Sequence, residues 1–137
     1  CVDANGIPTG VTTCTDTERS FKACISCHLT ETAARSARAV AKLRLTRLAD
    51  QVDSLLVRVA ATEFSTTDNR ITTAEGSRFN SGLARELGSA IHNPFLVEAL
   101  LIASLNQIGI DYGLRSTGIT SLRPQMIPPP QVKVKVK

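Results

Sequence analysis

The chain has 137 residues, a length typical of one domain, and its 42% hydrophobic content excludes an intrinsically disordered chain. Only 4% of the residues are aromatic and tryptophan is absent, so alanine, leucine and valine must supply most of the core, which suits packed helices. The net charge is +4, but no aromatic residues interleave the basic ones, and we therefore expect no nucleic-acid partner.

Residues 1–20 are rich in Gly, Pro, Thr and Asp and predict an irregular arm. The chain begins at Cys1 rather than at Met, as it would after removal of an export signal. In an oxidising compartment, Cys1 and Cys14 would form a disulfide across a loop that Gly6 and Gly10 make flexible. The alternative is a lipid anchor on Cys1, which would leave Cys14 as a free thiol.

The arm leads into C-I-S-C-H at residues 24–28, the C-x-x-C-H pattern of covalent haem attachment. Thioethers at Cys24 and Cys27 would meet two vinyl groups of one porphyrin, and His28 would then lie beneath the ring within reach of the iron. Because such attachment takes place outside the cytoplasm, we expect a periplasmic, extracellular or cell-surface protein. A zinc site using Cys14 would lack a second C-x-x-C pair, and a thioredoxin-like dithiol would lack its preceding strand.

Residues 30–64 contain no Gly or Pro and predict one long helix with Thr30 as its N-cap. Apolar residues recur along it at alternating spacings of four and three, which predicts a seam for a later helix or another subunit: Ala41, Leu45, Leu48, Val52, Leu55 and Val59. Its basic residues form a solvated face, or an arginine among them pairs with haem propionates: Arg35, Arg38, Lys42, Arg44 and Arg47.

A polar loop is expected at residues 65–76, followed by a shorter helix at 77–91 that Gly82 and Gly88 weaken. Four apolar residues would form one face of this helix: Phe79, Leu83, Leu87 and Ile91.

The clearest predicted helix covers residues 94–112, with Asn93 as N-cap, Pro94 at the first position and Gly113 at the end. It is apolar nearly all round, which predicts burial on most sides. Its most apolar run is short and is interrupted by Glu98, so we expect no transmembrane segment.

His92 is the only histidine besides His28 and lies directly before the cap of that helix. Backbone held by a cap suits an iron ligand that needs fixed geometry, whereas without the haem motif His92 would more simply bond a backbone carbonyl. Met126, an open position and a ligand from another chain are the alternatives. Two histidine ligands would give a lower potential than histidine with methionine.

Residues 117–137 predict an extended tail, separate from a haem-binding helical domain at 1–116. Pro128 to Pro130 are stiff, and the V-K alternation of residues 132–137 predicts either a strand added to a neighbour's sheet or a frayed terminus.

The motif at 24–28, the long helix after it and the I-H-N-P-F segment at 91–95 resemble c-type cytochromes of the bis-histidine, multihaem kind. Over residues 20–113 the resemblance implies an all-α cytochrome c module, in which a long helix packs against a buried C-terminal helix. It implies electron transfer rather than catalysis, through one covalent haem c with iron ligands His28 and His92. The chain departs from that pattern in having a single motif, so no haem relay within the chain is implied.

A single haem must approach another redox centre. The expected partners are therefore other redox proteins or haem-bearing subunits, in a homo-oligomer or a larger, even filamentous, complex. The alternative is a haem-based sensor or enzyme with a displaceable sixth ligand. A third hypothesis is a scaffold in which the haem mainly forms a core.

Overall fold

The computed structural model describes most of the chain: residues 1–5, 7–15, 19–65, 67–86 and 88–115. Met126 and the predicted tail at 117–137 lie outside the described residues. Within those residues the regular structure is helical, apart from an isolated bridge between Val2 and Pro8 in the N-terminal arm. The predicted all-α class is confirmed.

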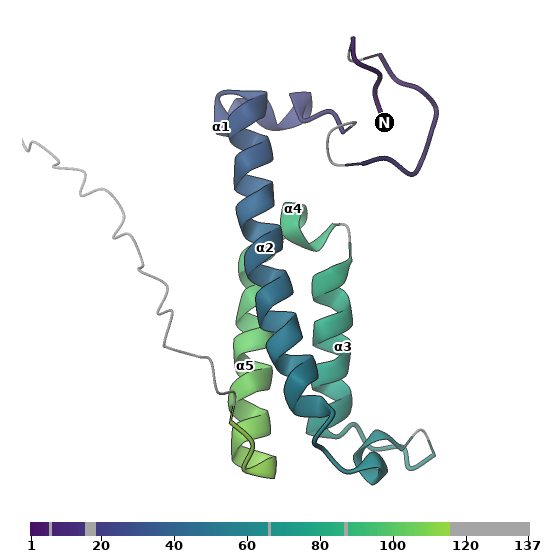
Figure 1. Ribbon diagram of the computed structural model, residues 1–137, viewed down its shortest axis with the longest axis vertical. Coiled ribbons are helices and arrows are strands. Elements are labelled where there is room, and N and C mark those ends of the chain that lie inside the picture. Colours follow the sequence, from purple (N-terminus) through teal and green to yellow (C-terminus); the bar gives the residue numbers. More distant parts are fainter. Residues whose placement is uncertain (6, 16–18, 66, 87, 116–137) are drawn as a thin grey trace, which may run out of the picture.

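Three helices form a bundle in which each contacts the other two: α2 (Glu31–Leu56), α3 (Thr73–Arg85) and α5 (Pro94–Tyr112). Shorter elements lie between or before them: η1 (Lys22–Cys24), α1 (Ile25–His28), η2 (Ala61–Phe64) and α4 (Ser89–His92). The first half of α2 projects beyond α3 and α5, and α1 and the N-terminal arm lie at its far end (Figure 1). The bundle therefore has a step, at which α4 meets the middle of α2.

The core lies where the second half of α2 meets α3 and α5. Its largest fully buried side chains come from α2 and α5: Leu45, Val52, Leu101 and Ile108. Most of the seam predicted along α2 is thus covered by helices of the same chain, with Leu48 and Val59 packed at its margin. The seam therefore gives no reason to expect a partner subunit.

The start of α3 differs from the prediction because a capping box places it at Thr73 rather than at residue 77. The Thr72 hydroxyl accepts a hydrogen bond from the Glu75 amide (3.2 Å), and the Glu75 carboxylate accepts one from the Thr72 amide (3.0 Å). This T-x-x-E signal is present in the sequence. The prediction missed it because Gly76 looked like part of a loop.

The predicted face of α3 is also wrong. Phe79, expected inside, is 70% exposed, and Ile91 lies in α4 with its side chain exposed. Leu83 is partly buried against the core, and Leu87 lies outside the described residues. The buried face consists of small residues: Ala74, Ser77, Ser81 and Ala84. Small side chains let helix backbones approach closely, so α3 packs on its neighbours through the face of alanine and serine rather than through the face that carries Phe79.

α2 ends at Leu56 instead of reaching residue 64, and the chain folds back through η2. Contacts with α3 hold this return. The Thr72 hydroxyl donates to the Glu63 carbonyl (2.5 Å), and the Arg78 guanidinium lies 3.8 Å from the centroid of the Phe64 ring. No Gly or Pro marks the turn, so tertiary contacts rather than local sequence end the helix.

α5 has the predicted bounds and caps. The Asn93 side chain accepts a hydrogen bond from the Leu96 amide (3.1 Å), and Gly113 adopts the left-handed conformation at φ 65°. The expectation of burial on most sides is wrong, because only the inner face packs on α2 and α3, while Phe95 and Ile110 are 81% and 74% exposed. By length and composition alone α5 is apolar enough to cross a membrane, a test that the core helix of a soluble protein also passes, so the expectation of no transmembrane segment stays a prediction.

Tyr112 ties the end of α5 to its neighbours. Its hydroxyl donates to Glu63 Oε2 (2.8 Å) and accepts from the Ala74 amide (3.2 Å). Burial, followed by the bond to Glu63, raises the pKa of the Tyr112 hydroxyl.

Tyr112→Phe is expected to lower the free energy of unfolding by about 1–2 kcal/mol at pH 7, because it removes both hydrogen bonds. A raised pKa in the folded state means that this contribution is complete below the unfolded-state pKa of about 10 and is lost as the pH rises through the folded-state value. Urea unfolding of both proteins at pH 7 and pH 11 measures the effect. An equal difference at the two pH values would contradict the assignment.

Candidate functional site

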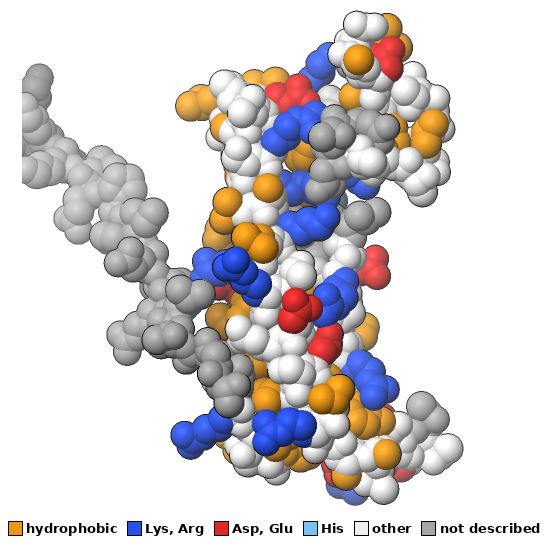
Figure 2. Space-filling model, viewed as in Figure 1, with side chains coloured by type: hydrophobic (Ala, Val, Ile, Leu, Met, Phe, Trp, Pro, Cys, Tyr) orange, Lys and Arg blue, Asp and Glu red, His pale blue; other side chains and the backbone are white. Residues whose placement is uncertain are grey.

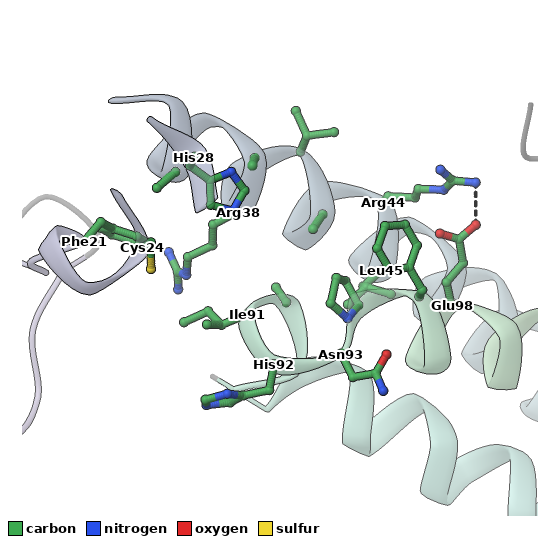
Figure 3. A pocket seen from close by; sticks show the side chains of 17 residues that line it. Phe21, Cys24, His28, Arg38, Arg44, Leu45, Ile91, His92, Asn93 and Glu98 are labelled. Carbon is green, nitrogen blue, oxygen red and sulfur yellow. Dashed lines mark ion pairs between the residues drawn. The ribbon is translucent and has the colours of Figure 1, made fainter. Parts of the chain in front are cut away.

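A pocket of about 460 Å³ opens at the step between the projecting half of α2 and the start of α5. Its volume lies within the range of small-molecule and cofactor sites. Three of the four predicted haem-site residues line it: Cys24, His28 and His92. His28, on α1, lies on one side of the space and His92, on α4, on the other (Figure 3). The fold thus brings the only two histidines of the chain to one pocket.

The fourth predicted residue, Cys27, does not line the pocket. It is exposed, and its sulfur lies 3.9 Å from the Ser26 hydroxyl. Both Cys24 and Cys27 are free thiols in the structure. They are three residues apart, Cys24 at the end of η1 and Cys27 within α1, and of the two only Cys24 lines the pocket.

Phe21 anchors the segment that carries the two cysteines. Its carbonyl accepts a hydrogen bond from the Cys24 amide, and its own amide donates to Glu31 Oε1, both at 2.9 Å. The Arg35 guanidinium also donates to Glu31 (3.0 Å). The Phe21 amide and Arg35 hold the pKa of the Glu31 carboxyl below its usual value. The segment that carries the two cysteines is therefore hydrogen-bonded to the first turn of α2.

The pocket walls include large apolar side chains that the described part of the chain leaves exposed: Val40, Ile91 and Phe95, at 68%, 41% and 81% exposure. Figure 2 shows hydrophobic side chains gathered along the edge formed by α1 and the projecting half of α2, with Lys and Arg side chains beside them. Apolar groups left open in a concave site are typical of ligand-binding pockets.

Sequence reasoning did not assign these walls to the site. Phe95 was detectable, because it directly follows the H-N-P segment, whereas Val40 belongs to no sequence motif.

Charged groups of α2 and α5 also reach the pocket. Arg38 is buried at 6% exposure, with its guanidinium 5.9 Å from the centroid of the Phe21 ring, and it extends between Cys24 and Ile91 (Figure 3). Arg44 and Glu98 form an ion pair elsewhere on the pocket wall.

Gly88 leaves room for the His92 ring. The His92 amide donates to the Gly88 carbonyl (2.9 Å), so the two residues face each other across one turn. A Cβ on residue 88 would lie 3.2 Å from His92 Cδ2, closer than ordinary van der Waals contact. The backbone of Gly88 is in the right-handed helical region, which alanine also adopts. The imidazole position therefore depends on the absence of a side chain at residue 88.

Gly88→Ala is expected to displace the imidazole of His92 without unfolding the protein. The measurement is the NMR chemical shift of the ring protons, which should move for His92 and stay unchanged for His28. Gly82→Ala is the matched control, because a Cβ there would meet nothing within 4 Å. It should stabilise α3 by about 1 kcal/mol and leave His92 in place. Identical His92 shifts in the two variants would refute this role of Gly88.

The N-terminal arm stands apart from this pocket. The structure joins Cys1 and Cys14 in a disulfide, with their Cα atoms 5.6 Å apart. The disulfide closes a loop that lies away from the bundle (Figure 1). In this arrangement the Cys1 sulfur is not available for a lipid anchor.

Among the described residues, no three His, Cys, Asp or Glu side chains form a group that could hold a metal ion unaided. No family model matches the chain, and no curated protein or solved structure matches it either. Any function must therefore be argued from the residues of this chain.

Proposed function

We propose that the chain is an electron-transfer protein that carries one covalent haem c, with thioethers at Cys24 and Cys27 and axial ligands His28 and His92. The observation that carries the proposal is the shared pocket: both histidines and Cys24 line it, and its apolar walls are open. A porphyrin is a large, planar and mostly apolar group. It would cover Val40, Ile91 and Phe95, which are otherwise exposed to water.

The state of the cysteines fits covalent attachment. Cys24 and Cys27 are free, and neither is drawn into the disulfide of the arm. Each thiol would add across one vinyl group, with sulfur bonding to one carbon and hydrogen to the other. This addition releases nothing and requires no oxidant. Haem attachment and the Cys1–Cys14 disulfide both suit a periplasmic or extracellular location.

The two histidines suit axial ligation because they come from opposite walls of the pocket. His28 and His92 would hold the iron of the haem, and Cys24 and Cys27 would hold its porphyrin. When bound, the group supplies one-electron chemistry, with the iron alternating between ferric and ferrous states. Because both histidines of the chain would bind the iron, we propose electron transfer rather than enzymatic activity.

We infer partners from the proposed electron transfer, because the helices of the bundle cover one another and do not themselves require a partner. One electron must enter from a donor and leave to an acceptor, so the chain needs at least one other redox protein or haem-bearing subunit. A homo-oligomer would satisfy the same need.

A haem-based sensor is the second candidate, and the exposure of His92 on the one-turn helix α4 favours it. In a sensor, His92 would be readily displaced from the iron, and added carbon monoxide would then change the absorption spectrum.

The decisive experiment is expression of the chain, behind an export signal, in a bacterial periplasm equipped for cytochrome c maturation. We expect a mass increase of one haem and low-spin spectra in both redox states that carbon monoxide does not change. The double variant Cys24→Ser with Cys27→Ser is the control and should carry no covalent haem. A wild-type chain without covalent haem would refute the proposal, and a carbon monoxide shift would favour the sensor.

A further inference from the structure

Glu98 is a charged residue in an apolar surrounding. It is 9% exposed, and it is the only charged residue of α5 between Phe95 and Ile110. Its carboxylate pairs with the Arg44 guanidinium of α2. Only Glu98 is buried in this pair, and taking a carboxylate out of water costs free energy that its ion pair often does no more than offset. The pair therefore calls for a reason other than the stability of the bundle.

The position of the pair in the pocket suggests that reason. Arg44 and Glu98 both line the pocket, and they lie at its opposite end from Cys24 (Figure 3). Arg38, by contrast, extends beside Cys24 (Figure 3). The pocket thus has a thiol end and an Arg44 end.

Arg44 keeps hydrogen-bonding capacity at its end of the pocket. A guanidinium has five donors, and a carboxylate engages at most two of them in a bidentate pair. The Arg44 side chain is 39% exposed, whereas that of Glu98 is 12% exposed. Glu98 thus binds Arg44 on the side of the protein, and among the described residues it is the one ion-pair partner of Arg44, which leaves further donors for a second anion.

We infer that Arg44 is the carboxylate-binding end of the pocket and that Glu98 positions it. The inference rests on the proposed function and adds the orientation of the haem. The vinyl groups and the propionates lie on opposite edges of a haem. If Cys24 and Cys27 hold the vinyl edge, the propionates point toward the opposite end of the pocket, where Arg44 lies.

The reduction equilibrium of the iron reports this contact. Arg44→Gln would leave a propionate without its cation, and the added negative charge would favour the ferric state. We expect the equilibrium constant for reduction to fall about tenfold, which is about 59 mV for a one-electron couple. Arg44→Lys keeps the charge but loses the planar fork, so it should recover most of the change. Glu98→Gln removes a negative charge and should shift the equilibrium in the opposite direction.

The experiment is a potentiometric titration of the haem-loaded full chain and these variants, with circular dichroism to verify folding. Arg47→Gln is the matched control, because Arg47 is an exposed residue of the same helix that does not line the pocket. It should change the equilibrium less than twofold. If Arg44→Gln behaves like Arg47→Gln, or if Arg44→Lys recovers nothing, the inference is overturned while the proposed function stands. A wild-type chain that carries no covalent haem would instead overturn the proposed function.

Discussion

On the proposed ligation by His28 and His92, His92→Ala is expected to convert a six-coordinate, low-spin iron into a five-coordinate, high-spin centre. His92 and His28 are the only histidines of the chain, and they line opposite walls of one pocket. Removal of His92 therefore leaves no second imidazole. The variant should keep its covalent haem, because the thiols and His28 are untouched. Absorption spectra should show a high-spin ferric state and a ferrous state that shifts on addition of carbon monoxide.

Free imidazole provides a direct check on this assignment. Added to His92→Ala, it should bind the vacant position and restore the low-spin spectrum, whereas it should leave the wild-type protein unchanged. Met126→Leu is the second control, because Met126 is the competing ligand within the chain. If Met126→Leu opens the iron to carbon monoxide and His92→Ala does not, the ligand assignment is wrong.

Local signals predicted the start of α2 and both ends of α5. Thr30 accepts a hydrogen bond from the Ala33 amide, as its type and position at the start of α2 indicated. Asn93, Pro94 and Gly113 mark the ends of α5 where the sequence placed them. These features involve residues within one turn of each other, so a single sequence contains the information.

Features that depend on distant segments were not predictable in this way. α3 buries alanine and serine and exposes Phe79, because close approach to two helices matters more than side-chain hydrophobicity. α2 stops at Leu56 because the return segment bonds to α3 and α5. Neither the buried face of α3 nor the end of α2 has a signal in the neighbouring sequence, because both depend on contacts with residues elsewhere in the chain.

The candidate site shows the same division. The C-x-x-C-H spacing predicted Cys24, Cys27 and His28, the scarcity of histidine predicted His92, and of these four Cys24, His28 and His92 line the pocket. Only the fold brings them to one pocket with Phe95 and with the Arg44–Glu98 pair. The sequence thus singled out the candidate ligands and placed Arg44 among several basic candidates, whereas the pocket that joins them and the pairing of Arg44 with Glu98 appear only in the fold.

Leu101→Ala is expected to lower the free energy of unfolding by about 3–4 kcal/mol, the effect typical of a leucine removed from a packed core. Leu101 is completely buried on α5 and belongs to the cluster shared with α2. Leu96→Ala is the matched control, because Leu96 is 53% exposed on the same helix. Its effect should stay below about 1 kcal/mol, since alanine favours the helix at least as well as leucine. Urea unfolding of the chain without haem measures both values.

The haem-loaded protein should tolerate Leu101→Ala better than the chain without haem. The core is small, so 3–4 kcal/mol is a large part of the stability expected for a domain of this size. A porphyrin packed against Val40 and Phe95 would add buried apolar surface in the folded state only, which raises the resistance to unfolding. The comparison is between two proteins that both carry Leu101→Ala: one loaded with haem, and one that also carries Cys24→Ser and Cys27→Ser and so binds no covalent haem. We expect the loaded protein to stay folded at urea concentrations that unfold the other. Equal urea midpoints would mean that the haem does not pack in the pocket.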